Sequence, residues 1–286
     1  MSTPWMVDVH THLFPDWVQQ NRWEYVKRDD VFRDIYRNKK ARMVTGEEMI
    51  ASMDEQEVAL SVVFGFPWAD QGINRDHNDY ILNVSRRFPD RLIPFACFNP
   101  LAAGAAEEAE RCIKKGAKGV GEIAFYDRVI DEEVVSCLRP VMEILKEANL
   151  PFLIHTNEPV GHVYPGKSMK NIAEIELLVQ NFPDNTIILA HWGGGILFYE
   201  LMKELKALFC HVYYDTAASP YLYQPEIFNV AGQVIGYERI LMGSDFPLIR
   251  PQRYYQQVRE TVKDKKVVRG ICRENALRLF KTLEVI

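Results

Sequence analysis

Short apolar runs recur along the chain, and each is followed by a stretch whose apolar residues recur with helical spacing. Most runs are almost continuously apolar, which is typical of parallel strands buried on both faces. The eight runs span Trp5–His12, Val58–Phe66, Leu92–Asn99, Gly119–Phe125, Leu150–His155, Thr186–His191, Val212–Asp215 and Ile240–Asp245. Eight strands alternating with helices predict an α/β fold, a (β/α)8 TIM barrel, with residues 1–286 as a single domain.

The segments between the runs carry helix signals. Thr45 and Glu48 have the spacing of a capping box, and residues 131–148 place their apolar side chains on one helical face. Ser168 is the predicted cap of a further helix that carries Ile172. A doubly wound open sheet is disfavoured, because no G-x-G-x-x-G motif follows the first run and because eight units suit a closed barrel.

A long insertion, residues 14–42, separates the first run from the first helix, where short loops are the norm. It contains Trp17, Trp23, Tyr25, Phe32 and Tyr36 among many charged residues. A loop at this position lies over the end of a barrel that carries the active site. We therefore expect either a lid or wall of a substrate pocket, or a peripheral subdomain or oligomer contact.

Composition narrows the classes of function. The 286 residues are 48% hydrophobic and 26% charged, as in ordinary globular proteins, and the net charge of −5 offers no footprint for nucleic acid or an anionic membrane. Five cysteines without a C-x-x-C pair argue against a secreted disulfide framework. The N-terminus has no signal-peptide pattern, and no apolar stretch is long enough to span a bilayer. These features predict a cytoplasmic protein.

Four histidines and one aspartate stand at the predicted carboxyl ends of strands: His10, His12, His155, His191 and Asp245. In a barrel these ends meet at one mouth. Side chains at i and i+2 on a strand point to the same face, so His10 and His12 can share one cation. Imidazole and carboxylate ligands together suit zinc, iron or manganese rather than calcium. The set predicts a divalent metal site, with zinc as the expected ion.

Glu122 lies inside the fourth apolar run. An ionisable side chain in a buried strand costs several kcal/mol unless it is paired or bound to metal. One interpretation is a salt bridge to a neighbouring Lys or Arg. The other, which we favour, is a metal ligand that bridges two ions.

The ordered motifs resemble the amidohydrolase superfamily, and within it the branch that includes aminocarboxymuconate semialdehyde decarboxylase. The resemblance covers the whole chain and is carried by motifs at both ends and in between: Asp8-x-His10-x-His12, Phe88-Pro-Asp-Arg91, His155, His191-Trp-Gly-Gly194, Gly243-Ser-Asp-Phe-Pro247 and Glu274-Asn-Ala-Leu-Arg-Leu-Phe280.

The resemblance implies that His10, His12, His155 and Asp245 coordinate a catalytic metal. It implies that His191 acts on substrate or bound water, or ligates a second metal. Many binuclear members carry a carboxylated lysine on strand four, and this chain has none there. Its Gly-Glu-Ile triplet instead resembles that of TatD-type deoxyribonucleases, in which the glutamate bridges two metals. The number of ions, one or two, therefore stays open.

Two chemistries fit these residues. In hydrolysis of an amide, ester or lactone, the metal lowers the pKa of water, Asp245 accepts its proton and His191 stabilises the developing oxyanion. In decarboxylation of an aromatic or unsaturated acid, the same groups hold the substrate carboxylate and protonate carbon. Glu122 favours the metal-dependent hydrolase, with the decarboxylase as the alternative. A non-catalytic metal-binding scaffold is the third and weakest interpretation.

Residues just beyond the strand ends are candidates for substrate contact. Trp68, Tyr126 and Arg250 are the ones we predict, the first two for an aromatic substrate and the arginine for a carboxylate. Gly193–Gly195 are expected to allow close packing near the metal rather than to cradle a phosphate. The expected partner is a small molecule, with no nucleic acid or membrane, and a homodimer is an expectation from the resemblance alone.

Overall fold

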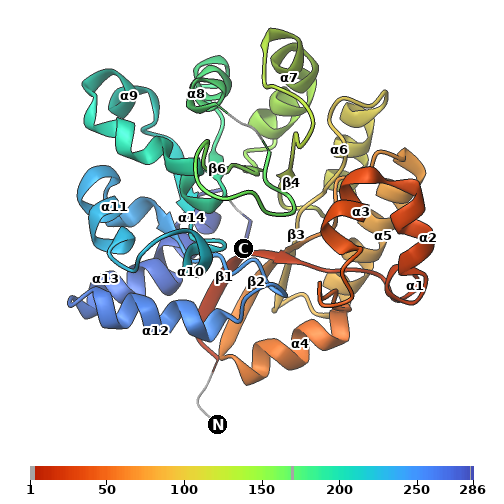
Figure 1. Cartoon of the computed structure of the whole chain (residues 1–286), viewed down its shortest axis with the longest axis horizontal. Coiled ribbons are helices and arrows are strands. Elements are labelled where there is room, and N and C mark those ends of the chain that lie inside the picture. The colour runs from red at the N-terminus through yellow and green to blue at the C-terminus, as the bar shows by residue number, and fades with distance from the viewer. Residues whose placement is uncertain (1–3, 169–170, 284) are drawn as a thin grey trace.

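A computed structural model describes residues 4–168, 171–283 and 285–286. Eight strands occur in this part of the chain, and every neighbouring pair is parallel (Figure 1). They are β1 (Met6–His12), β2 (Val58–Phe64), β3 (Leu92–Pro94), β4 (Val120–Ile123), β5 (Phe152–Ile154), β6 (Ile187–Leu189), β7 (Val212–Asp215) and β8 (Ile240–Leu241). The predicted alternation of strands and helices is confirmed, although most strands are shorter than the apolar runs.

The strands form two hydrogen-bonded groups, β1-β2-β3 and β4-β5-β6-β7-β8. Isolated parallel bridges join the groups at both ends, between Ala96 and Val120 and between Thr11 and Phe246. At the second junction the backbone N–H of Asp245 donates to the His10 carbonyl at 2.9 Å. The sheet thus closes on itself as a (β/α)8 barrel.

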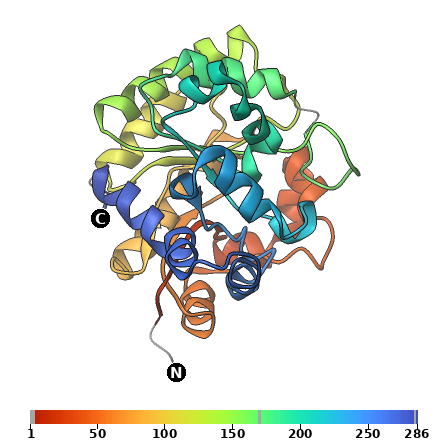
Figure 2. The same ribbon diagram turned by 90° about the vertical axis from the view of Figure 1, so that its left-hand side faces the viewer.

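Helices surround the barrel (Figures 1 and 2). They are α4 (Gly46–Glu55), α5 (Gln71–Arg87), α6 (Ala105–Lys114), α7 (Glu132–Glu147), α8 (Ile172–Asn181), α9 (Lys203–Leu208), α10 (Ser219–Leu222), α11 (Ile227–Ile235), α12 (Pro251–Thr261), α13 (Lys265–Arg269) and α14 (Asn275–Thr282). Two 3-10 segments, η1 (His191–Leu201) and η2 (Tyr237–Arg239), and a π-helical turn, η3 (Gly270–Glu274), lie between them. The predicted apolar face of α7 is buried in the main apolar core.

Of the two predicted helix caps, one is confirmed and one is not. The capping box of Thr45 and Glu48 is confirmed at the start of α4. The cap of α8 is Asn171, whose side chain accepts from the Ala173 N–H, so the prediction of Ser168 is wrong. The hydroxyl of Ser168 instead donates to Asn157 at 2.7 Å, which ties the loop after β5 to the end of that strand.

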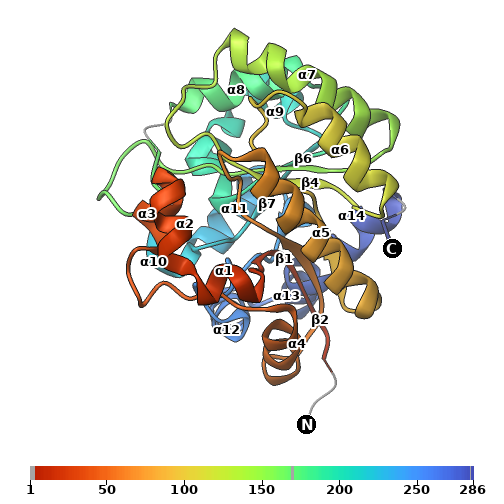
Figure 3. The ribbon, with the colours of Figure 1, turned by 90° about the vertical axis from the view of Figure 1, so that its right-hand side faces the viewer.

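The insertion after β1 folds into three short helices, α1 (Asp16–Gln20), α2 (Arg22–Arg28) and α3 (Asp30–Tyr36), which lie together at one side of the barrel beside α5 (Figure 3). They enclose a second apolar core, distinct from that of the barrel, made of Phe14, Val18, Val26, Phe32, Tyr36, Met43, Phe66, Trp68 and Ile73. The aromatic residues that made the insertion unusual in the sequence therefore pack against one another and against the segment that follows β2.

No helix in the part of the chain that the structure describes is long and apolar enough to cross a membrane.

Candidate metal centre

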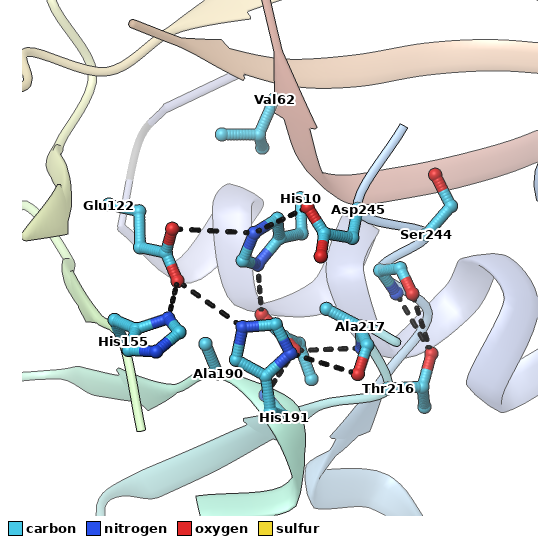
Figure 4. A network of polar contacts seen from close by, with 12 residues as sticks. His10, Val62, Glu122, His155, Ala190, His191, Thr216, Ala217, Ser244 and Asp245 are labelled. Atoms are coloured by element: carbon cyan, nitrogen blue, oxygen red, sulfur yellow. Dashed lines mark hydrogen bonds and ion pairs between the residues drawn. The ribbon is translucent and has the colours of Figure 1, made fainter. Parts of the chain in front are cut away.

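The predicted strand-end residues converge at one end of the barrel. His10 and His12 come from β1, Glu122 from β4, and His155, His191 and Asp245 follow β5, β6 and β8. Figure 4 shows His10, His155 and His191 turned toward Glu122. The barrel thus brings together residues that are up to 235 positions apart in the sequence.

Glu122 stands between two pairs of histidines. Its Oε2 lies 3.7 Å from Nε2 of both His10 and His12. Its Oε1 lies 3.0 Å from Nδ1 of His155 and 3.5 Å from Nε2 of His191. The alternative of a salt bridge to Lys or Arg is not what the structure shows, because the ion-pair partners described for Glu122 are these imidazoles.

Asp245 faces the first of these pairs. Its Oδ1 lies 3.3 Å from Nε2 of His12 and 3.8 Å from Nε2 of His10. Its backbone has a φ of 59°, a left-handed conformation that is uncommon for a residue other than glycine. Such backbone conformations persist where the surroundings hold them, and here the hydrogen bond to the His10 carbonyl does so.

Acceptors behind three of the imidazole rings determine which nitrogen faces the cluster. His10 Nδ1 lies 2.8 Å from Asp215 Oδ2, His12 Nδ1 lies 3.2 Å from the Gly65 carbonyl, and His191 Nδ1 lies 3.1 Å from the Ala217 carbonyl. A carbonyl or carboxylate oxygen only accepts, so each Nδ1 carries the proton. Each Nε2 is therefore the nitrogen that faces the centre, where it can bind a metal by releasing its proton, which is the usual arrangement behind metal-bound histidine.

Neighbouring charges strongly shift the pKa values of the imidazoles and carboxylates in the cluster. Burial alone would lower the pKa of His10, but the carboxylates of Asp215, Glu122 and Asp245 raise it to about 10. Burial would raise the pKa of Glu122, but His10 and His155 hold it well below its usual range. The pKa of His191 rises to about 9, because Glu122 outweighs the effect of burial. The buried carboxylates thus require positive charge beside them.

A divalent cation fits these residues. Three overlapping groups have one ligand atom each within 4.8 Å of the others: His10, His12 and Glu122; His10, His191 and Asp245; and Glu122, His155 and His191. Nε2 of His10 is buried and has no hydrogen-bond partner among the described residues. Imidazole nitrogens and carboxylate oxygens are the donors that zinc, manganese and iron accept.

The sequence profile of the family described as Amidohydrolase matches residues 7–282. The chain belongs to the amidohydrolase family. This confirms the family to which the motifs pointed and identifies the protein as an enzyme of that superfamily. None of the curated proteins matches it.

Several solved structures share the fold. The 5-carboxyvanillate decarboxylase of Sphingomonas paucimobilis has a TM-score of 0.73 and 17% identity, over 98% of this chain and 99% of that one. A 2,6-dihydroxybenzoate decarboxylase solved with 2,6-dihydroxybenzoate has a TM-score of 0.73 and 19% identity, over 98% and 100%. A dihydroxybenzoic acid decarboxylase of Polaromonas was solved with bound manganese and the inhibitor 2-nitroresorcinol. It has a TM-score of 0.71 and 17% identity, over 98% of this chain and 97% of that one. At these identities the similarity shows the fold alone.

A cavity of about 730 Å³ opens above the cluster of this amidohydrolase. His12, Glu122, His155, His191 and Asp245 lie on its lining. Aromatic side chains supply much of the remaining wall, namely Tyr36, Phe66, Tyr126, Tyr164 and Tyr221. The cavity has the size of a site for a small organic molecule.

The insertion forms part of this cavity, which was one of the two predicted possibilities. Residues 34–38 and 40–42 line it, including the cations Arg37, Lys40 and Arg42. Tyr36 connects the two regions, because its ring stacks on Phe32 in the second core at 4.6 Å while the residue lines the cavity.

Of the three predicted substrate contacts, Tyr126 lines the cavity and Trp68 and Arg250 do not. Trp68 is fully buried in the second core, where its indole N–H donates to His77 at 3.0 Å. Arg250 is exposed at the start of α12 and pairs with Glu55 at 3.0 Å. Neither residue lines the cavity, because the aromatic run after β2 turns into the second core and the chain after β8 runs outward before α12 begins.

Sequence reasoning missed Asp215 and assigned Tyr36 no individual role. Asp215 is the last residue of β7, and the rule that identified the other residues, a polar side chain at a strand end, also applies to it. It does not line the cavity but lies behind His10. Tyr36 gave no signal of its own, because nothing in the sequence indicates which aromatic residue of the insertion reaches the mouth.

The glycines after His191 allow two loops to approach closely, as predicted. Gly194 has a φ of 58°, and a Cβ there would lie 2.4 Å from the Asn157 carbonyl oxygen. A side chain at this position would push the segment after β6 away from the segment after β5, and these segments carry His191 and His155. We assign these glycines a packing role.

Proposed function

We propose that this amidohydrolase is a metal-dependent decarboxylase of an aromatic carboxylic acid. The observation that carries the proposal is the cavity, which has the cluster of histidines and carboxylates at its base and aromatic side chains along its walls. Aromatic walls suit a planar ring, and the cations Arg37, Lys40 and Arg42 at the rim suit an anion. Further support comes from the fold, which is also that of decarboxylases of hydroxylated aromatic acids.

The proposed ligands of the metal are His10, His12, His155 and Asp245. Zinc was the ion expected from the sequence, and manganese is an equal candidate because it is bound in one of the similar structures. A bound divalent ion supplies Lewis-acid stabilisation of negative charge on substrate oxygens.

The residues of the chain would then control the proton. In decarboxylation the bond from ring carbon to carboxylate breaks, carbon dioxide leaves, and a proton takes its place on the ring. His191 is the proposed donor, because its Nδ1 bonds to the Ala217 carbonyl and its Nε2 faces the base of the cavity. Burial raises the pKa of Tyr126 well above its usual range, so its phenol stays protonated as a hydrogen-bond donor to a substrate oxygen.

Turnover of hydroxylated benzoates and naphthoates by manganese-loaded and zinc-loaded enzyme tests the proposal. We expect release of carbon dioxide with at least one of these acids, and loss of 100-fold or more in kcat in His191→Asn. Because Asn can hydrogen-bond but cannot protonate carbon, substrate binding should persist in this variant. Absence of carbon dioxide release with both metals across the whole set of acids would contradict decarboxylation.

Hydrolysis of an ester or lactone is the second candidate, and the position of Glu122 favours it. A carboxylate whose two oxygens face two separate histidine pairs has the arrangement needed to bridge two ions. His191 would then be a ligand rather than a proton donor.

The metal count separates the two candidates. Hydrolysis predicts two ions per chain in the unsubstituted protein and one ion per chain in Glu122→Gln. It also predicts turnover of aromatic esters or lactones. A count of one in both proteins would contradict the bridging role.

A further inference from the structure

The centre contains a buried carboxylate that does not face the cavity. Asp215 has no exposed surface and lies behind His10, with its Oδ2 2.8 Å from His10 Nδ1. Its other oxygen, Oδ1, accepts two backbone N–H groups, those of His191 and Ala217, each at 2.9 Å. All its contacts described here are thus with hydrogen-bond donors.

We propose that Asp215 is the positioning residue of the metal centre: it keeps the proton of His10 on Nδ1 and holds the backbone of His191. The inference rests on the proposed ligation by His10. It places one carboxylate behind residues from two different strands, because His10 belongs to β1 and His191 follows β6.

The two backbone bonds fix the orientation of the Asp215 side chain. Both N–H groups point at Oδ1, so that position must remain an acceptor. Oδ2 is thereby directed at the imidazole, and because a carboxylate only accepts, Nδ1 must donate. Nε2 is then the nitrogen that faces the cluster and can bind the metal once it releases its proton, and it has no hydrogen-bond partner among the described residues.

The variant Asp215→Asn tests this directly. Its carbonyl oxygen must take the Oδ1 position to accept the two backbone N–H groups, so its NH₂ faces His10 Nδ1. Nδ1 must then accept, and the proton moves to Nε2, the atom that faces the metal. We expect metal affinity to fall roughly 10- to 100-fold, which is typical for loss of the residue behind a metal-bound histidine.

Thr216→Val is the matched control. Thr216 is the next residue, is also buried, and its hydroxyl donates to the Gly243 carbonyl at 2.9 Å without contacting an imidazole. The substitution keeps the shape and removes two buried hydrogen bonds, to the carbonyl and from the N–H of Gly243. We expect it to change stability but to leave metal affinity within about threefold of the unsubstituted protein, since only Asp215 determines the His10 tautomer.

Two measurements decide the proposal. Competition with a chromogenic chelator gives the metal affinity. The ¹⁵N spectra of histidine-labelled protein, assigned with a His10 variant, show whether His10 Nδ1 is protonated. The proposal predicts a protonated Nδ1 in the unsubstituted protein and an unprotonated Nδ1 in Asp215→Asn. An unprotonated Nδ1 in the unsubstituted protein overturns it even if the variant does not fold. Unchanged affinity in Asp215→Asn, or an equal loss in Thr216→Val, also overturns it.

Spectra of metal-free protein, recorded where the His10 ring carries a single proton, keep this test separate from the proposed function. If the protein binds no metal but Nδ1 of His10 changes as predicted, the metal site is wrong and the role of Asp215 in fixing the tautomer stands. If metal binds and Nδ1 does not change, the positioning role is wrong and the metal site stands.

Discussion

At the scale of single residues, the environment of each histidine distinguishes a structural role from a role at the centre. His77 is buried in α5, where its Nδ1 accepts from the indole N–H of Trp68 and its Nε2 donates to the Leu13 carbonyl at 2.7 Å. Both nitrogens are satisfied, and the residue does not line the cavity. His10 differs, because its Nε2 has no hydrogen-bond partner among the described residues.

His77 should make stability depend on pH. Burial lowers its pKa to about 4, from an ordinary value near 6.5. The unfolded chain therefore binds a proton between these pH values that the folded protein does not, so stability is full above pH 6.5 and falls as the pH drops toward 4. The loss attributable to His77 is about 3 kcal/mol by the bottom of this window.

The measurement is denaturant unfolding of chelator-treated protein between pH 7 and pH 4.5, compared with His77→Gln. Glutamine can keep one donor and one acceptor but does not titrate. The variant should therefore lose less stability across this range. Equal pH dependence of the two proteins would show that His77 is not responsible.

At the scale of elements, the insertion links a second core to the cavity. The rings of Trp68 and Phe32 lie 4.5 Å apart, and Phe32 stacks on Tyr36, which reaches the lining of the cavity. Burial, with Asp245 and Glu122 nearby, raises the pKa of Tyr36 above its usual range, so its hydroxyl is protonated. The insertion therefore provides a rigidly packed aromatic residue whose position depends on the core behind it.

Tyr36→Phe should separate these roles. The ring remains to fill the core, so the free energy of unfolding should change little, whereas loss of the hydroxyl should raise KM or the Kd of an aromatic acid roughly 3- to 10-fold. Tyr25→Phe is the control, because Tyr25 packs against the same core and does not line the cavity. Calorimetric titration with an aromatic acid checks the expectation, and equal effects of the two substitutions would assign Tyr36 a packing role only.

At the scale of the whole molecule, buried contacts hold neighbouring units of the barrel together. Glu200 of η1 is fully buried, accepts from the Tyr214 hydroxyl of β7 at 2.7 Å, and pairs with Arg239, which immediately precedes β8. The same kind of pair at the surface, Arg250 with Glu55, has both side chains about 60% exposed. The two pairs therefore differ mainly in how far water screens them.

Removing the acid from each pair should have very different effects. Glu200→Ala leaves the charge of Arg239 without its carboxylate and the Tyr214 hydroxyl without its acceptor, and should cost about 3–5 kcal/mol of unfolding free energy. Glu55→Ala should cost less than about 1 kcal/mol, because solvent screens that pair. Urea unfolding of both variants measures the difference, and similar losses would contradict the role given to the buried pair.

The sequence predicted most of the fold, because each buried parallel strand leaves a local apolar run and each helix leaves periodic spacing. It also identified the cluster, because a barrel brings strand ends together and His10, His12, Glu122, His155, His191 and Asp245 could be recognised at those ends. Trp68 and Arg250 do not line the cavity, and the sequence could not indicate this because the direction of a loop side chain depends on contacts with distant segments. The place of Asp215 at a strand end was a local signal, but its position behind His10, 205 positions away, is a contact that only the folded chain provides.

The metal content of the purified protein tests the central claim most directly. After exchange into manganese or zinc and removal of free ions, elemental analysis should give at least one ion per chain in the unsubstituted protein. It should give a clearly lower ratio of metal to protein in His155→Ala and in the double variant that carries both His10→Ala and His12→Ala. A ratio near zero in the unsubstituted protein, or an equal ratio in all three proteins, would contradict a metal centre at the mouth of this barrel.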